Sequence, residues 1–151
     1  MKIFVFDLDG TTVDSSHRVK HLPNGEVDLD HWYANSTAEQ LAKDTLLPVY
    51  DFWKSAREVG HMVVICTARI LRDCDHAFFE ANGLVADLIL GGLHGGKETP
   101  GQRKKRQIKG LAKQHANAHI TFFDDNPDVL REVSTLKGVL VVDAKMYNYT
   151  G

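Results

Sequence analysis

The sequence predicts an α/β fold: an open, three-layer Rossmann-like parallel sheet with helices on both faces. Short apolar runs alternate along the chain with segments in which apolar residues recur at helical spacing. The runs show little alternation of polar and apolar residues, which is typical of parallel strands covered on both faces. Strands that alternate with helices are joined by right-handed crossovers, so we expect the strands to form one sheet.

Five apolar runs are expected to form the strands, at residues 2–6, 62–66, 86–90, 119–123 and 138–142. Helices are predicted between them. Pro48 suits the first turn of a helix, and Gly60 ends that helix. Helical periodicity predicts three more helices, over 71–81, around 108–112, and from Pro127 after an Asn126 cap.

Residues 15–37 interrupt this alternation and are polar and rich in turn-forming residues. Asn24-Gly25 separates two short runs at 18–22 and 26–29, and an Asn-Gly dipeptide indicates a β-hairpin. A short helix near 36–43, begun by Ser36 or Thr37, should follow. We therefore expect a single domain over residues 1–151, in which residues 15–37 form a small hairpin flap as a minimal cap.

The composition indicates an ordinary soluble globular protein. The chain has 151 residues, of which 43% are apolar and 25% charged, and its net charge of -2 gives no general attraction to nucleic acid or anionic membranes. No membrane span or signal peptide is recognisable, so a cytoplasmic protein without a membrane partner is expected. Cys66 and Cys74 lack the spacing of a zinc site and are predicted to be reduced core thiols.

Polar side chains of a reactive kind follow three of the predicted strands. They are Asp7 and Asp9 after the first strand, Thr67 and Arg69 after the second, and Asp124 and Asp125 after the fourth. One acid at a strand end would be explained as a helix cap, but acids at several ends indicate a site, because ligands of open α/β sheets bind there. Neighbouring carboxylates repel unless a cation joins them, and Mg²⁺ accepts both carboxylate and phosphate oxygens. A magnesium site for phosphoryl chemistry is therefore predicted.

The segments DLDGTTVD, VVICTAR and FFDDNPDVL resemble the motifs of the haloacid-dehalogenase-like phosphatase superfamily. The resemblance covers almost the whole chain. It implies a Mg²⁺-dependent phosphomonoesterase that acts through an aspartyl-phosphate intermediate.

The resemblance also implies a role for each motif residue. Asp7 would be the nucleophile, and Asp9 would protonate the leaving oxygen and later activate water. Thr67 would donate a hydrogen bond to the phosphoryl group. Asp7, the backbone carbonyl of Asp9, and the pair Asp124 and Asp125 would hold Mg²⁺. Either acid of the pair can be the inner-sphere ligand, and Asp125 is preferred.

Three spacings resemble those in the phosphatase half of phage polynucleotide kinase/phosphatases. Lys105 precedes the second acid of the pair by 20 residues, Arg18 follows the nucleophile by 11, and Arg69 follows the motif threonine by two. This resemblance implies a catalytic Lys105 and substrate-binding Arg18 and Arg69, although Gly101 replaces an acid of that subfamily. The alternative for the basic run over 103–113 is the solvated face of a helix.

The segment GGLHGGKET at 91–99 nearly matches a phosphate-binding P-loop. Glu98 stands where a P-loop has Ser or Thr, and Pro100 follows in place of a helix continuing from the loop. We therefore expect a flexible substrate loop and not a kinase or nucleotide triphosphatase.

The short flap leaves no room for a large cap domain, so the site should be open to phosphates on large molecules. The leading interpretation is a phosphatase that removes 3′-phosphates from nucleic-acid ends. The alternatives are a small-molecule phosphatase such as a 5′(3′)-deoxyribonucleotidase and, from another class, a non-catalytic module that binds nucleic acid or a protein partner. Trp32 and Tyr33 could stack on a base or pack as a lid on Leu29 and Leu41.

Overall fold

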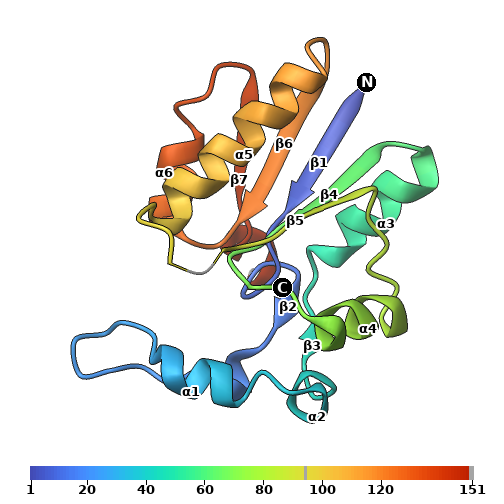
Figure 1. Cartoon of the computed structure of the whole chain (residues 1–151). Helices are drawn as coiled ribbons and strands as arrows, with labels where there is room; N and C mark the ends of the chain where they lie inside the picture. Colours follow the sequence, from blue (N-terminus) through green and yellow to red (C-terminus); the bar gives the residue numbers. More distant parts are fainter. Residues whose placement is uncertain (94, 150–151) are drawn as a thin grey trace.

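The computed structural model describes residues 1–93 and 95–149 and contains the predicted parallel sheet (Figure 1). The strand order is β5-β4-β1-β6-β7. The strands are β1 (Lys2–Phe6), β4 (Met62–Cys66), β5 (Leu88–Leu90), β6 (His119–Asp124) and β7 (Val139–Asp143). All four pairings are parallel, with β1 at the centre. The predicted α/β class is confirmed, and each strand lies within two residues of its expected position.

Helices cover both faces of the sheet (Figure 1). They are α3 (Tyr50–Val59) and α4 (Asp73–Ala81) on one face, and α5 (Pro100–Gln114) and α6 (Pro127–Val133) on the other. Successive side chains of β1 serve the two layers in turn, as the pleat of a strand requires. Ile3 and Val5 pack in the same core cluster as Ile108 of α5, whereas Phe6 stacks on Trp53 of α3 at 5.0 Å.

Helix α5 begins eight residues before the apolar positions that predicted it. Its start is a capping box, in which Thr99 Oγ1 accepts a hydrogen bond from the Gln102 amide and Gln102 accepts one from the Thr99 amide. Its first turns carry Lys104, whose amine reaches the end of β1 at Asp7. Hydrophobic periodicity therefore missed the part of the helix that serves the site.

The flap, residues 15–37, contains less strand and more helix than expected. The hairpin is reduced to one antiparallel bridge between His21 and Val27. Asp28 then caps a helix that the periodicity did not predict. The short elements are η1 (Ser16–Arg18) and α1 (Leu29–Ala34) in the flap, α2 (Ala38–Leu41) after it, the paired strands β2 (Val13–Asp14) and β3 (Thr45–Leu46), and α7 (Lys145–Asn148).

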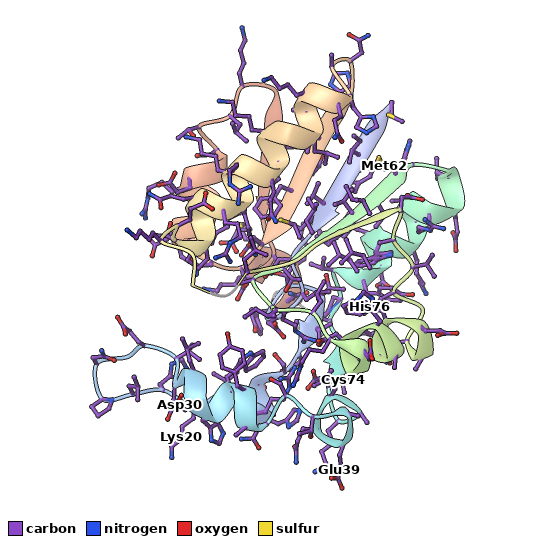
Figure 2. All side chains as sticks on the ribbon, in the orientation of Figure 1. Lys20, Asp30, Glu39, Met62, Cys74 and His76 are labelled. Carbon is purple, nitrogen blue, oxygen red and sulfur yellow. The ribbon has the colours of Figure 1, made fainter. Side chains whose placement is uncertain are left out.

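The flap projects as an arm from the end of the sheet at which β1 ends (Figure 1). Figure 2 shows Lys20 and Asp30 on the side of this arm that faces away from the sheet. The opposite side of the flap is therefore the one that faces the strand ends.

The helices and the two cysteines bear on what the composition predicts. No helix in the described ranges is both long and apolar enough for a membrane span. Cys66 and Cys74 are free thiols, as predicted, and burial raises the pKa of the Cys66 thiol to about 12.

Candidate active site

The loop after β1 fixes Asp7 at the centre of the strand ends. Asp7 is only 6% exposed. Thr12 Oγ1 donates a hydrogen bond to the Asp7 carbonyl at 2.8 Å, and Thr11 Oγ1 donates one to the Asp7 carboxylate at 3.0 Å. The two threonines that follow Gly10 in the sequence are therefore supports for the first acid.

Three carboxylates converge at this point. Oxygen atoms of Asp7, Asp124 and Asp125 lie within 4.8 Å of one another. Burial raises the pKa of Asp7 well above its usual value, and the charge of Asp124 raises it further. Such a cluster of buried oxygen donors fits a hard divalent cation such as Mg²⁺, which would offset the repulsion between the acids. The acids at the ends of β1 and β6 therefore lie together, as predicted.

Lys104, and not Lys105, lies among these acids. Lys104 Nζ is 2.8 Å from Asp7 and 2.8 Å from Asp124, and the side chain is buried. Burial lowers the pKa of Lys104, but the two carboxylates outweigh it and raise the pKa above its usual value, so the amine stays charged.

The structure therefore places Lys104, and not the predicted Lys105, beside the acids. Successive residues of a helix point about 100° apart, so only one of the two lysines can face the acids. Lys105 is half-buried and forms no ion pair with the residues that the structure describes. The 20-residue spacing to the acidic pair is kept, since it also separates Lys104 from Asp124.

Asp9 is held by Arg69 through two hydrogen bonds. Arg69 Nε and Nη2 lie 2.8 and 2.6 Å from the two carboxylate oxygens of Asp9, and Ser15 Oγ donates a further hydrogen bond at 2.8 Å. Burial alone would raise the pKa of Asp9, but the guanidinium charge and these hydrogen bonds lower it. Arg69 also binds Asp75 at 3.0 Å. In this structure, its partners are therefore carboxylates of the chain itself.

Arg18, the other predicted substrate contact, is 2% exposed and serves as a support. Its Nε and Nη2 bind the two carboxylate oxygens of Asp44 at 3.1 and 2.9 Å, and its Nη1 donates to Ser36 Oγ at 3.0 Å. It lies 4.0 Å from Asp9. Asp44 was missed from the sequence because it follows no strand and belongs to no recognisable motif.

Thr67 completes the site at the end of β4. Its side chain is buried, and its Oγ1 accepts a hydrogen bond from the Arg69 amide at 3.1 Å. Accepting this bond leaves the hydroxyl proton free to be donated toward a bound oxygen. The phosphoryl contact expected of Thr67 stays a prediction.

Gly10 has no room for a side chain. Its φ is +78°, and an added Cβ would lie 2.3 Å from Oδ2 of Asp125. The carboxylate of Asp125 occupies the space beside the glycine, which explains why glycine follows the two acids of the first motif.

Gly10→Ala is therefore expected to displace Asp125 and to lower kcat/KM by about 10- to 100-fold, mainly by raising the Mg²⁺ concentration needed for half-maximal activity. Gly60→Ala is the control, because φ is +91° there and an added Cβ meets nothing within 4 Å. Both variants place alanine at a positive φ, but only Gly10→Ala also meets Asp125, so its melting temperature should fall further than that of Gly60→Ala. An unchanged magnesium dependence in Gly10→Ala would contradict a role for Asp125 in holding the metal.

Comparison with known proteins gives the family. Residues 1–89 match the family model described as bacteriophage T5 5′-deoxynucleotidase. This match covers more than half of the chain and includes Asp7, Asp9, the flap and Thr67. The chain belongs to this family. The 5′-deoxynucleotidase of Escherichia phage T5 is 27% identical over 168 aligned positions, which cover 97% of this chain and 68% of that protein.

Solved structures agree with this family in fold. A chain of the Pnkp1/Rnl/Hen1 RNA repair complex is 20% identical with a TM-score of 0.65, and the alignment covers 94% of this chain and 42% of that one. A haloacid-dehalogenase-like hydrolase from Streptococcus pneumoniae is 15% identical with a TM-score of 0.63, covering 95% and 84%. This chain spans less than half the length of the RNA repair protein. The fold is therefore shared with haloacid-dehalogenase-like hydrolases, in agreement with the fold that the sequence resemblance implies.

Proposed function

We propose that this chain is a Mg²⁺-dependent phosphomonoesterase acting on nucleotides, first of all on deoxynucleoside 5′-monophosphates. The observation that carries this proposal is the buried carboxylate of Asp7, which lies among two further acids and the amine of Lys104. Membership of a 5′-deoxynucleotidase family supports the choice of substrate.

In the proposed first step, a carboxylate oxygen of Asp7 attacks the phosphorus of the substrate. The bond between phosphorus and the ester oxygen breaks, and Asp9 gives a proton to the leaving oxygen. Asp9 must therefore carry a proton at this step, although Arg69 favours its ionised form in the structure. In the second step, water attacks the phosphorus of the aspartyl-phosphate while Asp9 takes its proton, and Asp7 leaves as a carboxylate. Thr67 donates to a phosphoryl oxygen throughout.

The residues present fit a magnesium ion. Asp7, the backbone carbonyl of Asp9, and the pair Asp124 and Asp125 would hold it, with oxygen donors of the kind that Mg²⁺ prefers. Bound there, the ion would neutralise negative charge on the acids and on the phosphoryl oxygens. Lys104 contributes a second positive charge, which is held 2.8 Å from the nucleophile.

A 3′-phosphatase acting on nucleic-acid ends is the second candidate. Its support is the likeness of the fold to a chain of an RNA repair complex and the lack of a large cap domain in the described chain. Phosphate contacts from Lys and Arg would make such binding sensitive to salt.

A competition assay separates the candidates. The parent chain is given a deoxynucleoside 5′-monophosphate, the 3′-monophosphate of the same nucleoside, and a 3′-phosphorylated oligonucleotide, each with Mg²⁺ and with EDTA. We expect the 5′-monophosphate to show the highest kcat/KM and EDTA to abolish turnover. Faster hydrolysis of the oligonucleotide would favour the 3′-phosphatase. A lack of metal-dependent turnover on every substrate would overturn both and favour a non-catalytic binding module.

A further inference from the structure

A pocket beside Asp9 separates the flap from the ends of the strands. Its volume is about 320 Å³, near the lower end of the roughly 300–1,000 Å³ typical of small-ligand pockets. One wall comes from the flap, with Val27, Leu29 and Trp32 among its residues, and the other comes from Asp9, Arg69 and Pro100. The pocket therefore opens directly onto the catalytic groups.

The flap wall of the pocket is apolar, although it is open to solvent. Val27 is 40% exposed and Leu29 is 58% exposed. Figure 2 shows the charged residues Lys20 and Asp30 on the outer side of the flap, away from the sheet. Apolar side chains that stay exposed at the rim of a polar catalytic site indicate a ligand with an apolar part.

Trp32 is an aromatic residue of this wall that several contacts hold in place. The Arg18 guanidinium lies 4.1 Å from the centre of its ring, and Arg18 is itself held by Asp44 and Ser36. Ser36 Oγ also donates a hydrogen bond to the Trp32 carbonyl at 2.6 Å. A ring fixed in this way loses little conformational entropy when a ligand stacks on it.

Arg69 connects this aromatic wall with the reacting groups. Its guanidinium carbon lies 5.9 Å from the centre of the Trp32 ring, and its Nε lies 2.8 Å from Asp9. The Arg69 side chain thus lies between a ligand stacked on Trp32 and Asp9, which would protonate the leaving oxygen. The arrangement fits a molecule with a flat apolar body at one end and a phosphate ester at the other.

Resting on the nucleotidase function proposed above, we propose that this pocket binds the nucleobase of the substrate by stacking and apolar contact. Trp32 then determines the preference for nucleotides over phosphates that lack a base. No Asn, Gln, Ser or Thr is among the described residues that line the pocket, and its charged residues, Asp9 and Arg69, bind each other. Apart from the indole N–H of Trp32, the Tyr33 hydroxyl is the one further polar side-chain group among the described lining residues, and a single hydroxyl can donate to or accept from any base, so the pocket accepts purines and pyrimidines alike.

Steady-state kinetics test the role of Trp32. Trp32→Ala should lower kcat/KM for all four deoxynucleoside 5′-monophosphates by about 5- to 150-fold, the loss expected for one stacked base. Hydrolysis of 2-deoxyribose 5-phosphate, which has no base, should change by less than about threefold, and Trp32→Phe should retain most of the nucleotide activity. Leu29→Ser, at an exposed position, should show a smaller loss of the same selectivity. Val59→Ser, 70% exposed at the end of α3, is its control.

Tryptophan fluorescence tests binding without turnover. In an Asp7→Asn background, a deoxynucleoside 5′-monophosphate should quench the fluorescence of Trp32, and 2-deoxyribose 5-phosphate should not. Trp32→Phe should remove the quenching, because the other tryptophan, Trp53, is buried at 1% exposure in the core.

Three results would overturn the inference. An equal loss of activity on nucleotides and on 2-deoxyribose 5-phosphate in Trp32→Ala would show a merely structural role. No quenching in the Asp7→Asn background would exclude stacking on Trp32. A preference of the parent chain for one base over the other three by more than tenfold would contradict the tolerance of bases. Failure of the proposed function looks different, since the parent chain would then hydrolyse neither kind of phosphate.

Discussion

Asp7→Asn is expected to lower kcat by at least about 10³-fold and, in the presence of EDTA, to raise the melting temperature. The loss of activity follows because an amide cannot form the aspartyl-phosphate. The gain in stability follows because the variant removes one of three neighbouring carboxylates, two buried and one half-buried, that repel one another. Lys104 keeps Asp124 as its partner at 2.8 Å. Activity assays and thermal melting in EDTA measure the two effects.

The stability gain should depend on pH with a definite sign. The pKa of Asp7 is higher in the folded protein than in the unfolded chain, chiefly because of burial and the charge of Asp124. Its ionised form therefore opposes folding, and this cost grows as pH rises from the unfolded value of about 4 toward the folded value. The difference in melting temperature between Asp7→Asn and the parent should consequently shrink as pH falls from 8 toward 5.

Asp128→Asn is the matched control for this experiment. Its side chain is 84% exposed and pairs with Arg131 on the surface of α6. It should leave both activity and melting temperature nearly unchanged. Equal or lower stability of Asp7→Asn in EDTA at pH 8 would contradict the account of repulsion among the three acids.

Lys104→Ala is expected to lower kcat/KM by about 10²- to 10³-fold, whereas Lys105→Ala should stay within about threefold of the parent chain. Lys104 is buried and contacts the nucleophile, and Lys105 is half-buried on a neighbouring part of the same helix. Removing Lys104 also leaves Asp7 and Asp124 without their shared amine, so the melting temperature in EDTA should fall.

The pair of variants decides which lysine serves the reaction. Both remove the same charge from the same helix, so a general electrostatic effect would lower the activity of both. Lys104→Arg adds a further check, because it keeps the charge but alters the shape of the donor. A larger loss in Lys105→Ala than in Lys104→Ala would overturn the assignment.

The parts of this molecule that could be predicted from sequence are those with a local physical cause. Strands such as 62–66 are continuous apolar runs because both of their faces are covered, and the shortness of such a run favours a strand over a buried helix. The acids after β1 and β6 had to meet, since both strands end at the same edge of the sheet. Gly60 and Asn126 marked helix ends through their own backbone preferences.

The parts that could not be predicted depend on contacts between distant residues. The start of α5 carries few apolar side chains, so hydrophobic periodicity could not show which side of this helix faces the sheet. The choice between Lys104 and Lys105 depends on that orientation. Arg18 was expected at the substrate because its spacing from the nucleophile matched a known pattern. Its pairing with Asp44 could not be predicted. The distance along the sequence from Asp7 to Arg18 does not show which carboxylate lies next to Arg18 in the folded chain.

The acids that meet at the centre of the sheet come from positions 117 residues apart, at Asp7 and Asp124. A chain still being synthesised has Asp7 early but cannot assemble the proposed magnesium site until β6 has formed beside β1. The ion can therefore stabilise only the finished sheet and gives no help to shorter intermediates. Magnesium added during refolding should accordingly slow unfolding more than it speeds folding, unless β1 and β6 are already paired in the transition state.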